Sequence, residues 1–331
     1  MSRRWPISVD SFLVSASIIA LGRSDSHALV APRARSLGVE YEAIEGYEVA
    51  EHLQDLASGR RGTLTSRLAA LQNDGPVVVA AIDSSITAGM LRSFALHLEK
   101  VGLTQIALRS DPQLLEKLAT LDARENSEVE EARDRRNPEE LLLLSIARSP
   151  HGQVAVWPII SISREGVISH LHAVSEEMID RIIEKAVAEI AEISLVGVLT
   201  YVIDPEDVSV LRREFGLARI TFWSESASYT SVSEQIIRSI LDLPLGDVRM
   251  IDYEEYFLEE EIEVNLDLIK DPIRPFLHLF ARNPRLKVRY LSHGHSAEVV
   301  GTMRTQISLF GSTEDEVHTE LAHARDFMQG R

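Results

Sequence analysis

The sequence predicts an α/β fold whose N-terminal third holds a mostly parallel, doubly wound sheet. Strand-like and helix-like segments alternate over the first 110 residues, which is typical of parallel strands joined by helices. The clearest strand signal is the apolar run 76–82 between Gly75 and Asp83, which fits a strand buried on both faces. After residue 150, a predicted hairpin and longer helices indicate further domains.

The N-terminal elements are assigned from hydrophobic periodicity. We expect strands that alternate with helices, at 12–19, 39–44, 76–82 and 104–108 for the strands and at 24–36, 49–57, 64–71, 86–101 and 114–121 for the helices. The stretch 12–21 is interrupted by serines and no small-residue cleavage site follows it, so it predicts a buried strand rather than a signal peptide.

The second half begins with a predicted hairpin, strands 154–162 and 167–172 around a turn at 164–166. A helix over 176–193 carries one apolar stripe and leads into a strand at 196–203. The remaining expected elements are helices at 231–241 and 314–328 and short strands at 247–251, 288–291 and 306–309.

Composition restricts the partners and the chemistry. The 331 residues carry a net charge of −17, which repels nucleic-acid phosphates and anionic lipid headgroups. We therefore predict a cytoplasmic protein with neither nucleic acid nor membrane as partner. The chain has no cysteine, so disulfides, thiolate metal sites and cysteine nucleophiles are excluded.

Residues 123–140 are almost entirely charged or polar, which favours a solvated helix or a linker. The domain division predicted from these patterns is 1–110 for the first domain, 111–150 for a charged linker, 151–246 for a central domain and 247–331 for a C-terminal domain.

Three segments together resemble a known family. They are VAVWPIISISREGVI at 154–168, the pair of VGVL at 196–199 and SILDLPLG at 239–246, and GTMRTQISLFG at 301–311 followed by an acidic helix start. In this order and spacing they are similar to 5-(carboxyamino)imidazole ribonucleotide synthase, an ATP-grasp enzyme of bacterial purine synthesis. The resemblance implies a pre-ATP-grasp domain, a truncated ATP-grasp central domain with 111–150 replacing the ATP-binding subdomain, and a small α+β C-terminal domain.

The resemblance also implies chemistry that this chain does not carry at the matching positions. ATP-grasp enzymes hold triphosphate with cations and magnesium with carboxylates. The position of one family glutamate falls on Val202, and the chain has five lysines, none between Lys117 and the strand at 154. Thr302, Met303 and Gln306 stand where the family has a basic C-terminal loop.

The candidate binding residues follow from the same comparison. Gly22, Arg23 and Ser24 end the first predicted strand, where the family places a phosphate loop; the structural alternative is a turn at Gly22 with Ser24 as helix N-cap. Arg304 is a candidate substrate anion ligand or a surface arginine. No catalytic residue and no metal ligand is assigned.

Two other patterns are open to more than one interpretation. His170 and His172 share a strand face and could bind zinc together with His293 or His295. The acidic run 254–263 fits a solvated helix face or a contact surface for a basic partner.

Three functional hypotheses follow. The first is a catalytically degenerate relative, without cofactor, that serves as a binding, regulatory or assembly module and forms a homodimer or joins a purine-pathway protein. The second is an active ligase using ATP and magnesium, with Arg23, Arg212, Arg213, Arg219 and Arg304 in place of lysines. The third is a small-molecule sensor that binds at the carboxyl edge of the N-terminal sheet.

Overall fold

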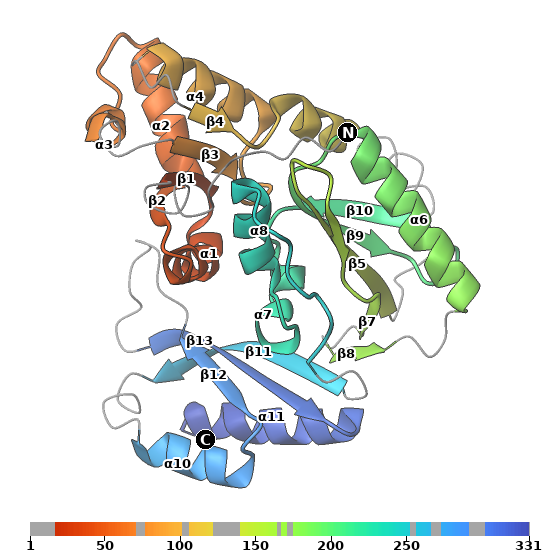
Figure 1. Ribbon diagram of the computed structural model, residues 1–331. Coiled ribbons are helices and arrows are strands. Elements are labelled where there is room, and N and C mark those ends of the chain that lie inside the picture. Colours follow the sequence, from red (N-terminus) through yellow and green to blue (C-terminus); the bar gives the residue numbers. More distant parts are fainter. Residues whose placement is uncertain are drawn as a thin grey trace.

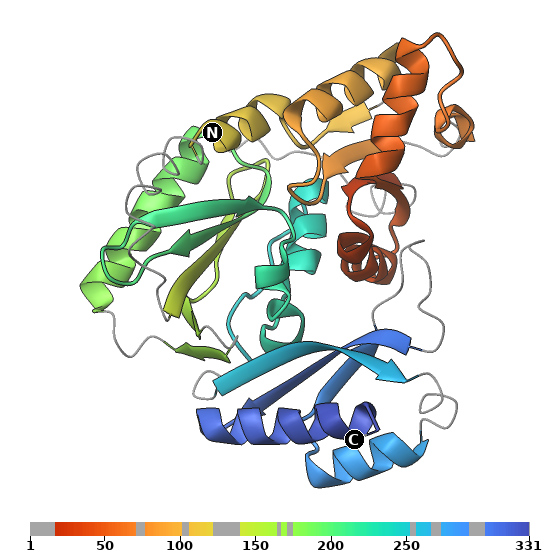
Figure 2. The same ribbon diagram turned by 180° about the vertical axis from the view of Figure 1, so that it is seen from behind.

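The computed structural model describes residues 17–70, 77–100, 106–121, 140–163, 167–170, 175–251, 256–265, 273–290 and 302–330. Within these residues the chain forms two sheets. Figure 1 shows an N-terminal, a central and a C-terminal lobe arranged around helix α8, and the larger sheet extends through the last two lobes. Figure 2 shows from behind that the C-terminal lobe lies below the other two lobes.

The N-terminal sheet is parallel, as predicted. Its strands are β1 (Ser17–Gly22), β2 (Glu40–Glu45), β3 (Val77–Ala81) and β4 (Ile106–Leu108), in the order β2-β1-β3-β4. Helices α1 (Ser24–Ser36), α2 (Gly46–Ala57), α3 (Thr65–Ala70) and α4 (Ala88–Lys100) connect or flank them. Ile18 packs in one core with Val30 of α1, whereas Ile19 packs in another with Leu91 of α4, so helices cover both faces.

The second sheet is antiparallel and continuous from the central lobe to the C-terminal lobe. Its order is β10-β9-β5-β7-β8-β11-β13-β12, with β6 paired to β5. The strands are β5 (Glu140–Arg148), β6 (Val154–Val156), β7 (Ile160–Ser163), β8 (Val167–His170), β9 (Gly197–Ile203), β10 (Val210–Phe215), β11 (Tyr256–Asn265), β12 (Lys287–Tyr290) and β13 (Thr302–Gly311). The lobes join where Phe257 of β11 pairs with Ile168 of β8.

Capped helices cover this sheet. Ser175, Ser231 and Thr313 each accept a backbone N–H at the start of a helix, which satisfies one of its free donors. The helices are α6 (Glu176–Glu192), α8 (Val232–Leu241) and α11 (Glu314–Met328), with α7 (Ser224–Ala227), α10 (Ile273–Arg282) and the 3₁₀ turn η3 (Arg219–Thr221). α8 contacts β9, β5, β3 and α1, so it forms the packing centre between the lobes.

The structure corrects several sequence predictions. Strand β5 lies inside the large sheet between β9 and β7, and no strand was predicted at 140–148. The acidic run assigned to a helix face is strand β11, because Leu258, Ile262 and Val264 lie on the face that packs into the core with α11, and the odd-numbered glutamates lie on the opposite face. The expected strand at 247–251 is only an isolated bridge at Met250. Residues 12–16 and the predicted turn 164–166 lie outside the described residues.

Across the part of the chain that the structure describes, we find no helix with both the length and the apolar character required to cross a bilayer.

Candidate functional site

The carboxyl ends of β1 and β3 meet at the start of α1. The buried carboxylate of Asp83 follows β3 and accepts the backbone N–H groups of Arg23, at 2.8 Å, and Ser85, at 2.8 Å. Arg23 is the N-cap residue of α1, and its side chain makes no capping hydrogen bond. The amide at this helix N-terminus is therefore bound to a carboxylate of the chain itself, at the place where helix termini bind phosphate in other proteins.

Packing requires a glycine at position 22. A Cβ atom at Gly22 would lie 2.6 Å from Ile82 Cγ1 and 2.8 Å from Asp83 Oδ2, so only glycine lets β1 approach the end of β3 this closely. Ser24 is the first helical residue rather than the N-cap, which corrects the structural alternative considered for it.

A chain of ion pairs joins this sheet edge to the C-terminal sheet. Arg23 Nε lies 3.2 Å from Asp25, and Arg219 of η3 lies 3.8 Å from both Asp25 and Glu261. Glu261 on β11 also pairs with Arg304 on β13. We call these five residues the junction network. It brings together Arg23 and Arg304, which are 281 positions apart in the sequence.

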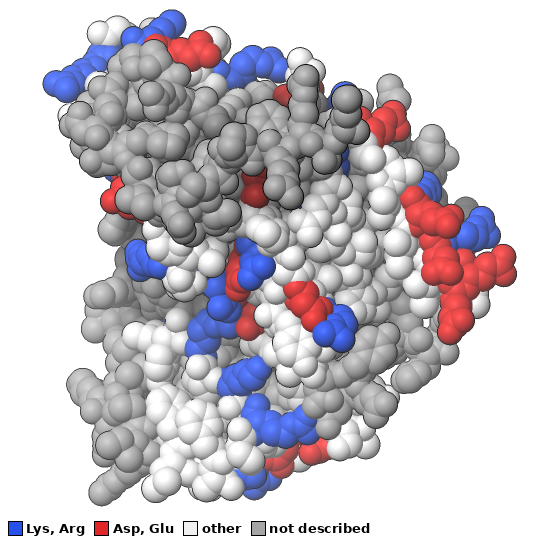
Figure 3. Space-filling model, in the orientation of Figure 1, with Lys and Arg blue, Asp and Glu red and all other residues white. Residues whose placement is uncertain are grey.

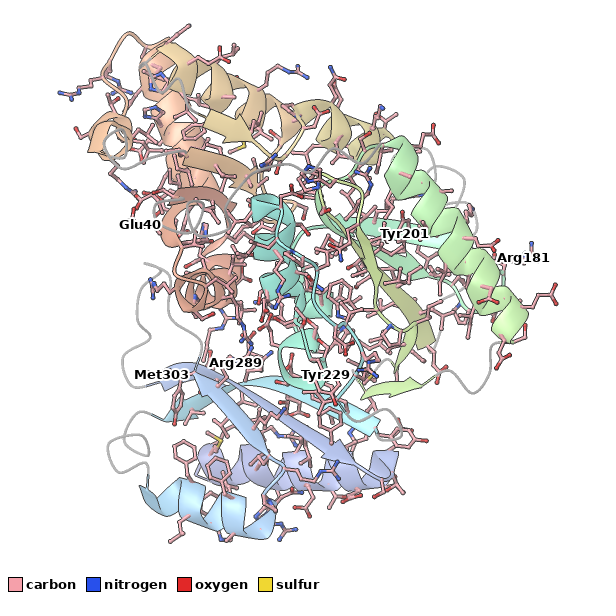
Figure 4. All side chains as sticks on the ribbon, viewed as in Figure 1. Glu40, Arg181, Tyr201, Tyr229, Arg289 and Met303 are labelled. Atoms are coloured by element: carbon pink, nitrogen blue, oxygen red, sulfur yellow. The ribbon has the colours of Figure 1, made fainter. Side chains whose placement is uncertain are left out.

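The glutamate two residues before Glu261 on β11 has an unusual environment. The pKa of Glu259 is raised to about 7, mainly by burial; the nearby Glu225 also raises it, whereas Arg289 and a hydrogen bond with Gln306 lower it. Arg289 donates to Gln306 at 3.2 Å. Figure 4 shows Arg289 on the side of the C-terminal sheet that faces α1 and α7.

The neighbouring Lys287 forms a hydrogen bond with α7. Its ammonium group donates to the carbonyl of Ser226 at 2.6 Å, and burial together with Arg289 lowers the pKa of this lysine. Figure 3 shows basic and acidic side chains interspersed down the face of the molecule that contains this region. The surface at the junction is thus mixed in charge, although the chain as a whole is strongly acidic.

The residues at the positions implied for magnesium and ATP do not fit those groups. Val202, where the resemblance places a carboxylate, is 1% exposed and packs in the core beneath α8. A buried aliphatic side chain offers no ligand to a hard cation. Among the arginines considered as substitutes for lysine, three come together: Arg23, Arg219 and Arg304. The other two lie on β10 and pair elsewhere, Arg212 with Glu214 of the same strand and Arg213 with Glu189 of α6.

No cluster of three His, Asp or Glu side chains suited to a metal occurs among the residues that the structure describes. His172, His293 and His295 lie outside those residues, so the zinc hypothesis built on them stays a prediction.

The sequence did not single out Asp25, Glu259 or Glu261 as site residues. Glu259 and Glu261 lie in an acidic run that, taken alone, favours a solvated surface, and Asp25 lies in the first turn of a predicted helix. The period-2 alternation of apolar residues in β11 is the signal that could have placed Glu259 and Glu261 on one face.

Comparison with known proteins gives a consistent picture. No family model matches the chain. The N5-carboxyaminoimidazole ribonucleotide synthase of Mycobacterium leprae is 27% identical over 161 residues, which cover 43% of this chain and 35% of that protein. The matched segment thus spans about a third of the length of this curated relative.

Solved structures match over almost the whole chain. The N5-carboxyaminoimidazole ribonucleotide synthetase from Thermus thermophilus superposes with a TM-score of 0.63 at 14% identity, covering 95% of this chain and 99% of that one. This chain has the fold of the N5-carboxyaminoimidazole ribonucleotide synthases. The resemblance seen in the sequence is therefore confirmed.

The synthase fold does not by itself decide the reaction. A structure named glycinamide-RNase-transformylase T from Mycobacterium tuberculosis matches with a TM-score of 0.62 at 14% identity, covering 94% of this chain and 99% of that one. Because proteins with differently named activities share this architecture, the function has to be argued from the residues of the site.

Proposed function

We propose that this chain is a catalytically inactive member of the synthase fold that serves as a binding or regulatory module. The observation that carries the proposal is the junction network. The groups that would meet a phosphate are bound to carboxylates of the same chain: the Arg23 amide to Asp83, and the Arg219 and Arg304 guanidiniums to Glu261.

Charge explains why such an arrangement opposes catalysis. A triphosphate needs excess positive charge around it, and transition-state stabilisation in phosphoryl transfer depends on preorganised cations. Each arginine of the junction network already has a carboxylate within 4.0 Å, so an incoming phosphate would have to displace that carboxylate. The buried Val202 adds a second, independent loss at the implied magnesium position.

Titration calorimetry with magnesium-ATP tests the proposal directly. We expect no binding at micromolar concentrations and no ADP release when bicarbonate and aminoimidazole ribonucleotide are added. The synthase from Thermus thermophilus, assayed with the same reagents, serves as the positive control. Micromolar binding, or ADP release that requires both co-substrates, would overturn the proposal.

A charge-removal variant tests the physical reason. Glu261→Gln leaves Arg219 and Arg304 without their shared carboxylate, so we expect a gain in the affinity for ADP of about tenfold. Glu184→Gln removes the same charge from an exposed position on α6 and is expected to change nothing. Equal affinities in both variants and the unmodified protein would show that the carboxylate does not block the arginines.

A second candidate is an active ligase with relocated cationic groups. The convergence of Arg23, Arg219 and Arg304 on one junction favours it, since three arginines from separate elements meet there. Under this alternative, Arg304→Gln abolishes an ADP release that the unmodified protein shows. Under the first proposal, neither protein releases ADP above the buffer rate.

Self-association, a purine-pathway partner, a cytoplasmic location and the division of the chain at residues 110, 150 and 246 stay predictions. Light scattering coupled to gel filtration would measure the oligomeric state, and a mass of about twice 36.9 kDa is expected for the homodimer.

A further inference from the structure

A cavity of about 320 Å³ lies between α6 and the edge of the central sheet. Aliphatic side chains of α6, β9, β10 and the loop between those strands form its apolar wall: Met178, Ile182, Ala186, Ile203, Val208 and Val210. The volume is at the lower end of the range for small-molecule sites. Because Ile203 packs under α6 while Val202 packs under α8, the sheet separates this cavity from the core on the α8 side.

Polar side chains that hydrogen-bond to one another form one end of the cavity. Glu189 accepts two hydrogen bonds from Arg213, at 2.7 and 3.0 Å, and a third from the Tyr201 hydroxyl at 3.2 Å. The Arg213 guanidinium also lies 5.7 Å from the centre of the Tyr201 ring. Both Glu189 and Tyr201 line the cavity, and Figure 4 shows Tyr201 beneath α6. These contacts hold the polar end in one geometry.

Two cations line the cavity from α6, and the carboxylate of Asp207 lines it from the loop between β9 and β10. Arg181 and Lys185 are four residues apart and therefore lie on one face of the helix. Both side chains are exposed, and among the described residues neither takes part in an ion pair. Of the two carboxylates that line the cavity, Glu189 is paired with Arg213, so Arg181 and Lys185 outnumber the remaining one, Asp207, and favour an anion beside the apolar wall.

The loop between β9 and β10 is strained where it lines the cavity. Val208 has a φ of 61°, a left-handed conformation that a β-branched residue rarely adopts. The conformation is held by hydrogen bonds from Val208 N to the carbonyl of Asp204 at 3.0 Å and from Asp204 N to the carbonyl of Ser209 at 2.9 Å. Strain retained by such contacts is typical of ligand sites.

We propose that this cavity binds a small molecule with an apolar body and a single anionic group. The apolar body lies against Ile203 and Val208, and the anionic group lies at Arg181 and Lys185. The site is separate from the junction network, so the proposal does not depend on whether the chain binds ATP.

Fluorescence titration of the full chain with 1-anilinonaphthalene-8-sulfonate, an apolar monoanion, tests the site. We expect saturable binding that weakens about tenfold in the double variant R181Q/K185Q, because both charge-assisted contacts are lost. Lys117→Gln, at an exposed position on the helix over 112–121, is the matched control and is expected to bind as the unmodified protein does. Equal binding by the double variant would overturn the proposal.

A cavity-filling variant tests the apolar wall. Ala186→Leu places three further carbon atoms in the cavity and is expected to reduce the affinity for the probe at least about tenfold, whereas Ala191→Leu at an exposed position of the same helix leaves it unchanged. If Ala186→Leu does not fold, the double variant R181Q/K185Q still tests the site, because both of its substitutions are at exposed positions. Unchanged binding by folded Ala186→Leu would show that the probe binds elsewhere.

Competition defines the chemical class. Octanoate and octyl phosphate are expected to displace the probe at concentrations at least about tenfold lower than octanol does. The ratio between the two anions distinguishes a carboxylate ligand from a phosphate ligand. Displacement by octanol at the same concentration as octanoate would refute the anionic part of the proposal.

Discussion

The junction network and the Arg213–Glu189 pair are both built from arginines and carboxylates, but they differ in exposure. The side chains of the junction network are 29–64% exposed, whereas those of Arg213 and Glu189 are 2% and 19% exposed. Water screens the first set and compensates its partners when a contact is lost, while the second has little access to water. The comparison teaches that the contacts of the exposed network contribute little to stability, whereas the Arg213–Glu189 pair is part of the structure that holds α6 on the sheet.

The largest expected effect comes from breaking the buried pair. Glu189→Ala removes the bidentate partner of a guanidinium that stays buried, and we expect a loss of about 3 kcal/mol in the free energy of unfolding. Urea denaturation measures it. Glu192→Ala, exposed on the same helix, is the control, and an equal loss in both variants would show that the pair is no more important than a surface charge.

Next in size is a pH-dependent gain at Glu259, beside the junction network. Its pKa is raised to about 7 by burial, so the folded state favours the protonated form and loses stability as the pH rises from 4.5 through 7. Glu259→Gln keeps the neutral shape, and we expect it to raise the free energy of unfolding by up to about 3 kcal/mol at pH 8 and about 1 kcal/mol at pH 5. A gain of equal size at both pH values would contradict the assigned burial.

Gly22→Ala should have an intermediate effect. The added Cβ meets Ile82 and Asp83 at less than 3.0 Å, so we expect a loss of about 2 kcal/mol in the free energy of unfolding. Gly89→Ala is the matched control, because a Cβ there finds open space up to Thr87 at 4.0 Å. Equal stabilities of the two variants would show that packing does not require Gly22. The phosphate-loop interpretation of Gly22 would then be the better explanation.

The smallest effect is expected in the junction network itself. Arg219→Gln breaks two contacts of 3.8 Å made by a side chain that is 64% exposed, and we expect a change within about 0.5 kcal/mol. The change should shrink further in about 0.5 M salt. A loss above about 1.5 kcal/mol would show that the network does stabilise the junction between the lobes.

The sequence predicted the helices better than it predicted the strands. Helix α1 and helix α11 have the bounds expected from periodicity, and α11 carries the anticipated acidic first turn. Strands β5 and β11 were missed because each borders or contains a run of charges. Local charge cannot distinguish a solvated helix from a strand with one face in the core, since the apolar partners of that face are far away in the sequence.

The candidate site residues likewise fall into two groups, those that the sequence identified and those that only the structure identified. Gly22, Arg23, Arg219 and Arg304 were identified from the sequence, but the carboxylate partners Asp83 and Glu261 were not. An ion pair depends on the distance between two side chains, and the chain distance between Arg219 and Glu261 is 42 residues.

The sequence alone determined the alternation of strands and helices and the family resemblance. It also determined that Val202 stands where the family has a glutamate. These properties depend on the order of residue types along the chain. The tertiary structure alone decided that the arginines of the junction network share carboxylates, that the Glu259 carboxyl group is shielded from water, and that a cavity lined by Arg181 and Lys185 lies beneath α6. Each of these depends on how segments remote in sequence approach one another, because burial and Coulomb interactions are set by distance in space.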